Sequence, residues 1–158
     1  MSKNADQKSP HYDCPTPHVL VVDRNEDYGR LVVAALHELS MRAKHTRTVD
    51  EFLDLNCRTR VDLVSLEVEP CLPHTIESLR VLRTHFGEGP GTRIIASSCI
   101  AAAGFELLVE RHGADACINH RLEPNALAAW LNAELQRKKI ASVSGEWVRS
   151  RSHGEARK

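Results

Sequence analysis

The segment from Val61 to Pro70 reads VDLVSLEVEP, and it constrains the fold more than any other part of the sequence. Its first half is apolar, β-branched or small and is too short for a helix, so it predicts a strand buried on both faces. Two carboxylates, Glu67 and Glu69, follow where this strand ends. The ligand crevice of an open α/β sheet lies outside the carboxyl ends of its strands. We therefore expect Glu67 to stand where any chemistry would occur.

A short apolar run followed by a helix-like segment occurs five times between residues 18 and 139. Strands are predicted at 18–22, 42–46, 61–65, 93–97 and 116–118, and helices at 25–41, 48–55, 76–86, 101–112 and 124–139. Five such alternations with short links predict an α/β domain with a parallel sheet, right-handed crossovers and helices on both faces. The charged second run suits an edge strand, because charge on an edge blocks further pairing.

Local signals place several helix ends and faces. Leu31 and Leu39 belong to the apolar stripe of the first predicted helix. Thr48 with Glu51 three residues later predicts a capping box at the start of the second. Gly113 suits the C-terminal cap of the fourth.

Composition predicts one domain with two tails. A chain of 158 residues with 42% hydrophobic content suffices for one compact core. Residues 1–17 are polar and proline-containing and predict a disordered leader, residues 18–139 form the domain, and residues 140–158 predict a flexible basic tail. Lys and Arg number 21, as do Asp and Glu, so net charge argues against a nucleic-acid partner. From Arg137 to Lys158, however, seven basic residues face two acidic ones, an excess of +5 that leaves −5 for the remainder.

The cysteines indicate a reducing, cytoplasmic location. The five cysteines show no CxxC spacing and follow no apolar signal segment, and no apolar run is long enough to cross a membrane. Cys99 and Cys117 fall at the ends of neighbouring predicted strands, where they would form either a redox pair or two buried apolar side chains. His11 and Cys14 are a close pair of soft ligands near the N-terminus, and scattered surface histidines are favoured over a metal site there.

The order of elements and four motifs resemble the receiver domain of bacterial two-component response regulators. HVLVVD is similar to the family's first strand and acidic turn, VDLVSLE to its phosphoacceptor strand, RIIASSC to its fourth strand, and GADACINHRLEP to the stretch that includes the lysine–proline turn. The resemblance covers about residues 18–139. It implies a flavodoxin-like (βα)5, doubly wound, five-stranded parallel sheet with strand order 2-1-3-4-5.

The resemblance assigns roles to six positions and shows that most of them are substituted. Asp23 stands at the first magnesium-binding acid and Arg24 at the second, while Glu67 stands at the phosphorylated aspartate. Ser98 matches the hydroxyl that follows the phosphoryl group. Cys117 takes the place of a switching aromatic residue, and His120 takes that of the lysine.

The substitutions at these positions oppose magnesium-dependent phosphorylation. Magnesium requires octahedral oxygen ligation, whereas Arg24 contributes a permanent cation that pairs with carboxylates. An ion pair from Arg24 to Glu67 or to Asp23 would substitute for the metal. Glutamate is one methylene longer than aspartate, and misplacement of the attacking oxygen by about 1 Å costs about 100-fold in rate. His120 is shorter than lysine and is mostly neutral near pH 7, so it is a weak countercharge.

Three interpretations of Glu67 follow. It is a solvated acid in a decayed pocket, a permanent mimic of the phosphorylated state, or part of a pocket that still binds metal with Glu26 or Glu69 as substitute ligands. We expect no cofactor, with magnesium binding doubtful.

The last predicted helix carries a candidate contact residue. Ala126, Trp130 and Ala133 fall away from its leucine face, which is typical of a binding surface. Alternatively, Trp130 packs over the neighbouring helix. The resemblance favours contact, because receivers often pair through the face of their fourth helix, fifth strand and fifth helix, and it makes a homodimer an expectation.

Together these observations predict a stand-alone atypical receiver that binds proteins without phosphorylation and has no catalytic activity. Its partner would be a histidine kinase or another bacterial signalling protein. One alternative is a single-domain response regulator that is still phosphorylated. Another is a nucleic-acid-associated protein that uses its basic tail.

Overall fold

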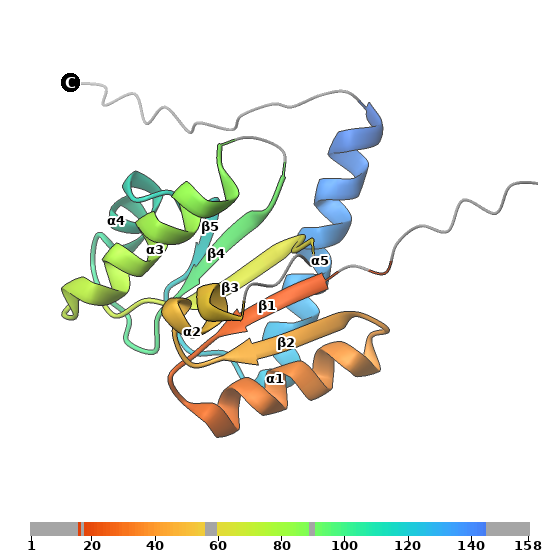
Figure 1. The fold of residues 1–158 in the computed structure, drawn as a ribbon, viewed down its shortest axis with the longest axis horizontal. Helices are drawn as coiled ribbons and strands as arrows, with labels where there is room; N and C mark the ends of the chain where they lie inside the picture. The colour runs from red at the N-terminus through yellow and green to blue at the C-terminus, as the bar shows by residue number, and fades with distance from the viewer. Residues whose placement is uncertain (1–15, 17, 56–59, 89–90, 145–158) are drawn as a thin grey trace, which may run out of the picture.

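The computed structural model describes residues 16, 18–55, 60–88 and 91–144. Strands and helices alternate as the sequence predicts (Figure 1). The strands are β1 (His18–Val22), β2 (Arg42–Thr46), β3 (Leu63–Glu67), β4 (Arg93–Ser97) and β5 (Ala116–Ile118), and the helices are α1 (Glu26–Glu38), α2 (Val49–Asp54), α3 (Pro73–Phe86), α4 (Phe105–Arg111) and α5 (Pro124–Ser144).

The five strands form one parallel sheet in the order β2-β1-β3-β4-β5. This confirms the predicted topology, including the charged edge strand β2. Along β1, Leu20 and Val22 face one core while Val19 and Val21 face the other. Successive side chains of β1 enter opposite cores, so every position from Val19 to Val22 is apolar.

Helices α1 and α5 cover one face of the sheet, and α2, α3 and α4 cover the other. The first layer is anchored by buried side chains of α1 and α5: Val32, Ala35, Leu36, Leu127, Ala128, Leu131 and Leu135. The second is anchored by those of α2, α3 and α4: Val49, Phe52, Leu79, Leu82, Phe105 and Val109. Each helix thus binds the sheet through one apolar stripe.

Several predicted boundaries and faces differ from the structure. Helix α1 ends at Glu38 instead of residue 41, and α3 begins at Pro73 instead of residue 76. The central strand begins at Leu63 and includes Glu67 as its last residue, whereas the run was predicted from Val61. Leu31 and Leu39 are 58% and 43% exposed, so they do not belong to the buried stripe. Leu39 is the residue that caps α1, and Leu31 lies outside the arc that faces the sheet.

Helix α4 begins at Phe105 instead of residue 101. Gly104 has a φ of +76°, a left-handed conformation that the helix cannot continue through. Ala102 is fixed outside the helix, because the side chain of Asn119 bonds both its amide and its carbonyl, at 3.0 and 3.2 Å. The other end agrees with the prediction: Gly113 has a φ of +108°, and it and Ala114 donate back to the last turn.

At the start of α2, one of the two hydrogen bonds of the predicted capping box is present. Thr48 Oγ1 accepts from the amide of Glu51 at 3.1 Å. The Glu51 carboxylate accepts from the amide of Arg47 at 2.8 Å, one residue before the position that the motif specifies.

Helix α5 continues to Ser144, so the boundary predicted after Lys139 is too early. The remaining tail, and the leader apart from Thr16, lie outside the described residues. None of the helices within the described ranges has the length and apolarity to span a membrane.

Arg83 links helix α3 to the segments that follow α3 and α4. Its side chain is 10% exposed and donates to the carbonyls of Gly113 at 2.8 Å and Gly87 at 3.1 Å, and to the carboxylate of Asp115 at 2.6 Å. A buried cation with these partners leaves several polar groups unsatisfied when it is removed.

We expect Arg83→Met to lower the free energy of unfolding by about 3 kcal/mol, since it leaves two carbonyls without this donor and the Asp115 carboxylate without its cation, with the Ile94 amide still bonded to it. Arg80→Met is the control, because Arg80 is 63% exposed and pairs only with exposed Glu77; its effect should stay below about 0.5 kcal/mol. Urea unfolding of both variants makes the comparison, and equal effects would contradict the role of Arg83.

Candidate functional site

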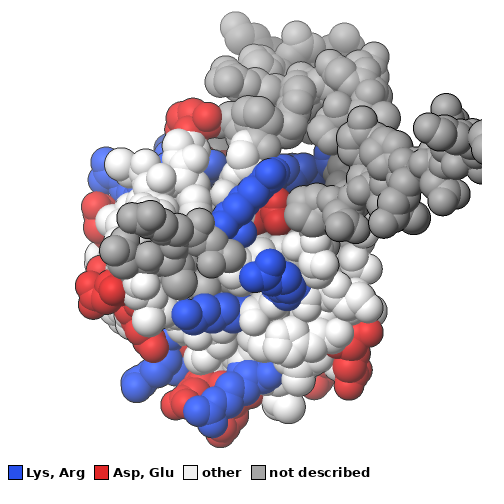
Figure 2. Space-filling view, turned by 45° about the vertical axis from the view of Figure 1, so that its right-hand side comes forward, with Lys and Arg blue, Asp and Glu red and all other residues white. Residues whose placement is uncertain are grey.

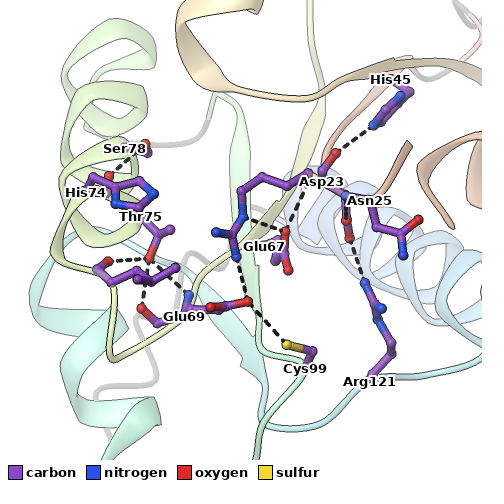
Figure 3. Close-up of polar contacts among 12 residues, drawn as sticks. Asp23, Asn25, His45, Glu67, Glu69, His74, Thr75, Ser78, Cys99 and Arg121 are labelled. Carbon is purple, nitrogen blue, oxygen red and sulfur yellow. Dashed lines mark hydrogen bonds and ion pairs between the residues drawn. The ribbon is translucent and has the colours of Figure 1, made fainter. Parts of the chain in front are cut away.

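The candidate site lies where β1, β3 and β4 end. Asp23 follows β1, Glu67 ends β3, and Ser97 ends β4 beside it, since Glu67 and Ser97 are register partners. Parallel strands bring these positions to one edge of the sheet (Figure 3). The sequence predicted this convergence for Asp23 and Glu67.

Arg24 binds both carboxylates of the central strand and its loop. Its amide donates to Glu67 Oε2 at 3.1 Å, its Nε lies 3.4 Å from the same oxygen, and its terminal nitrogen lies 2.6 Å from Glu69 Oε1. The expected pair between Arg24 and Glu67 is thus present. Glu69 is held in turn by Thr75, whose Oγ1 accepts from the Glu69 amide at 3.0 Å. We call this arrangement of Arg24, Glu67 and Glu69 the arginine clasp.

A second arginine, Arg121, forms an ion pair with Asp23. Asp23 is 5% exposed, and its Oδ2 lies 3.5 Å from a terminal nitrogen of Arg121. The Arg121 guanidinium also lies 4.1 Å above the ring of Tyr28, whose hydroxyl donates to the Leu122 carbonyl at 2.7 Å. Asp23 therefore pairs with Arg121 and not with Arg24. The loop between β5 and α5 is held to the site by these contacts.

Arg121, the residue after His120, supplies the cation beside Asp23. His120 is exposed and lines the rim of the pocket, whereas Arg121 reaches inward to Asp23. Sequence reasoning assigned Arg121 no role at this site. The tyrosine at position 28, one helical turn into α1, was the available signal, because guanidinium groups stack on aromatic rings.

Asp23 is the titrating group of the site. Burial and the charge of Glu67 raise its pKa to about 6 from the ordinary 3.8. The Asn25 amide, which donates to Asp23 Oδ1 at 2.8 Å, opposes this rise, as do the charges of Arg121 and His45. The carboxylate pair thus remains partly repulsive even with arginines beside it.

The predicted Ser98 and its neighbour Ser97 both line the pocket that holds Asp23 and Glu67. Ser97 is the register partner of Glu67, and in-register residues of parallel strands face the same side of the sheet. Ser98 is 1% exposed, and its hydroxyl donates to the Ile100 carbonyl at 2.7 Å within a turn.

The two strand-end cysteines have different surroundings, which gives the redox pair no support. Cys99 Sγ donates to Glu69 Oε1 at 3.5 Å, while Cys117 packs against the core beneath α4. Both thiols are free, and burial raises the pKa of each. Cys117 therefore behaves as the small apolar side chain of the alternative interpretation.

The residues present do not suit magnesium. Ligand atoms of Glu67, Glu69 and Cys99 lie within 4.8 Å of one another, but Arg24 already bonds the two carboxylates, and a thiol is a poor magnesium ligand. Glu26, named as a substitute ligand, pairs instead with Arg30 on the surface of α1. The space left in the pocket suffices for about one water molecule.

Trp130 is partly buried and packs against the core between α1 and α5. This favours the packing alternative for its indole over a freely exposed contact. Around it, Ala126 and Ala133 are exposed as predicted.

No protein-family model matches the sequence, and no curated protein matches it either. Solved structures match most of its length. They include a CheY-like receiver domain protein from Methanospirillum hungatei JF-1 (TM-score 0.66, 19% identity, covering 80% of this chain and 98% of that one), a response regulator from Thermotoga maritima (TM-score 0.65, 20% identity, 77% and 99%) and a receiver protein from Burkholderia phymatum (TM-score 0.61, 27% identity, 77% and 96%). The chain thus has the receiver-domain fold of response regulators, which confirms the resemblance in its sequence.

The raised pKa of Asp23 predicts that Asp23→Asn stabilises the protein at neutral pH. The folded pKa, about 6, lies above the ordinary 3.8, so the ionised carboxylate disfavours the fold above about pH 6 and this cost disappears as pH falls toward 4. We expect the variant to exceed the parent by at most about 3 kcal/mol at about pH 7.5 and by little at about pH 4. Urea unfolding across this range tests it, and a variant that is less stable at neutral pH would contradict the prediction.

Proposed function

We propose that this receiver-fold chain is a phosphorylation-independent signalling module that acts in the cytoplasm by binding another protein, without catalytic activity of its own. The arginine clasp is the observation that carries the proposal. In it, the guanidinium of Arg24 binds Glu67 and Glu69, the carboxylates that metal-dependent phosphorylation would need unbound.

The clasp opposes phosphorylation in two ways. Glu67 Oε2 already accepts from the amide and the Nε of Arg24, so attack on a phosphorus atom requires the loss of both contacts. A magnesium ion approaching Glu67 and Glu69 meets a permanent positive charge 2.6 Å from Glu69 Oε1. Repulsion between like charges in a partly buried pocket is strong, because water screens it poorly.

The loop contacts support a single conformational state. Arg121 binds Asp23 and Tyr28 at once, and Tyr28 bonds the backbone of Leu122. Cys117 contributes no aromatic ring that could change rotamer with phosphorylation. The protein would then present one surface permanently and signal through its binding partner.

The proposed surface is the one formed by α4, β5 and α5. Ile100 and Leu107, before and within α4, are 56% and 54% exposed. Large exposed apolar side chains on one face are typical of protein-binding sites. The partner would be another signalling protein, such as a histidine kinase, or a second copy of this chain.

The alternative is a response regulator that is still phosphorylated. The retained placement of Asp23 and Glu67 at one edge of the sheet is the observation that favours it. Magnesium dependence separates the two functions.

We expect no magnesium-dependent modification by acetyl phosphate or beryllofluoride, because Arg24 occupies the carboxylates. Intact mass and amide spectra measure this. A stable gain of one phosphoryl group, or magnesium-dependent shifts centred on Asp23 and Glu67, would establish the alternative.

The matched control restores the missing groups in the same chain. Arg24→Asp with Glu67→Asp and His120→Lys removes the clasp and should produce magnesium-dependent shifts at Asp23. The control triple variant, Arg30→Asp with Glu67→Asp and His120→Lys, changes the net charge equally but keeps Arg24. Its charge change lies on the surface of α1, where Arg30 is 70% exposed. This variant should show no such shifts.

We expect Leu107→Glu to weaken self-association or partner binding by more than about tenfold if Leu107 is a buried contact. Leu31→Glu is the control, since Leu31 is 58% exposed on α1. Sedimentation of the purified chain, alone and with a candidate kinase, gives the readout. Equal behaviour of the two variants would place the interface elsewhere.

A further inference from the structure

We propose that the edge of the sheet opposite the candidate site binds the phosphate backbone of a nucleic acid. This edge holds the first residues of the strands and the second half of α5. We call it the basal face and define its cations as Arg42, Arg60, Arg93, Arg137 and Lys138. The proposal is independent of the proposed function, because the two use opposite edges of the sheet.

The parallel sheet gathers these cations from separate parts of the chain. Arg42 begins β2 and pairs in register with His18 at the start of β1, while Arg93 begins β4 and pairs with Leu63 at the start of β3. Arg60 precedes β3. From β2 to β4 the sheet crosses three strand spacings, or about 14 Å.

Helix α5 adds two cations to the same edge. Lys138 Nζ contacts the carbonyl of Gly91 and lies 3.4 Å from the carbonyl of Asp62, so the helix is fixed against the starts of β3 and β4. Arg137, one residue earlier, bonds Glu134 at 2.7 Å.

The acids of the basal face lie beneath its cations. The Glu134 side chain is 4% exposed and accepts from both Arg93 and Arg137. Asp62 is 22% exposed and accepts from the His18 amide and from Arg60. By contrast, the side chains of Arg60 and Arg137 are 77% and 73% exposed.

The outer surface of the basal face is therefore positive. Asp115, which precedes β5 and whose charge acts on Lys138, belongs to the same edge with Asp62 and Glu134, so the five cations exceed these three acids by two. Figure 2 brings the starts of β1 and β2 toward the viewer and shows Lys and Arg side chains over the middle of this face, with most acidic side chains toward its margin.

An extended polyanion fits this surface better than a single anion. Four of the five cations are arginines, whose planar forks match phosphate oxygens. A span of about 14 Å covers several phosphates, which follow at about 3.4 Å per strand along duplex DNA.

The test measures binding of the full chain to a labelled single-stranded oligonucleotide of about 20 nucleotides by fluorescence anisotropy. We expect affinity to fall steeply with salt. Arg60→Gln with Arg137→Gln should weaken binding about tenfold at about 50 mM salt and reduce the slope of log affinity against log salt by about 1.4.

The matched control is Arg30→Gln with Arg47→Gln. It removes the same charge from exposed positions on α1 and after the carboxyl end of β2. This variant should bind as the parent does. Circular dichroism of both variants verifies that the fold is retained.

Three results would overturn the proposal. The first is no binding at about 50 mM salt, where such contacts are strong. The second is an equal effect of the two double variants, or no effect of either. The third is a polyglutamate peptide of similar length that competes equally well and with the same residue dependence, which would identify an acidic protein as the partner.

Discussion

The contact of the Arg24 guanidinium with Glu67 and Glu69 is the interaction on which the candidate site depends. Parallel strands bring Asp23 and Glu67 to one edge, and two carboxylates so placed repel each other in a partly buried pocket. Arg24 offsets this repulsion on one side and Arg121 on the other. Burial, and after it the charge of Glu67, still raise the pKa of Asp23 to about 6 despite these cations.

Most strand boundaries could be predicted because they depend on local patterns, whereas the strand order was implied by the resemblance to receiver domains. β4 and β5 have the predicted bounds, since β-branched runs between turn residues specify short buried strands. The edge position of β2 followed from its charge. The start of α4 was not predictable from apolar spacing, because Gly104 in a left-handed conformation and the side chain of Asn119 exclude residues 101–104 from the helix.

The composition of the site was only partly predictable. Asp23, Arg24 and Glu67 were placed correctly, since strand ends in a parallel sheet converge. The predicted Ser98 and His120 line the pocket, and the structure adds to each an adjacent residue that the sequence did not single out, Ser97 and Arg121. Register decides the first and loop conformation the second, and neither is determined by local sequence. The basal face was invisible for a similar reason, because its cations are separated in sequence and its acids are covered only in three dimensions.

A tethered guanidinium differs from a bound metal ion in one consequence for signalling. Magnesium and a phosphoryl group come and go, and they shift a conformational equilibrium only through their different affinities for its two states. Arg24 is present in every state, so its contacts add a constant bias that responds to no signal. Under the proposed function, regulation of this fold therefore enters through ligands of its surface. The exposed apolar side chains near α4 and the cations of the basal face lie outside the arginine clasp, so a partner at either can bind without opening it.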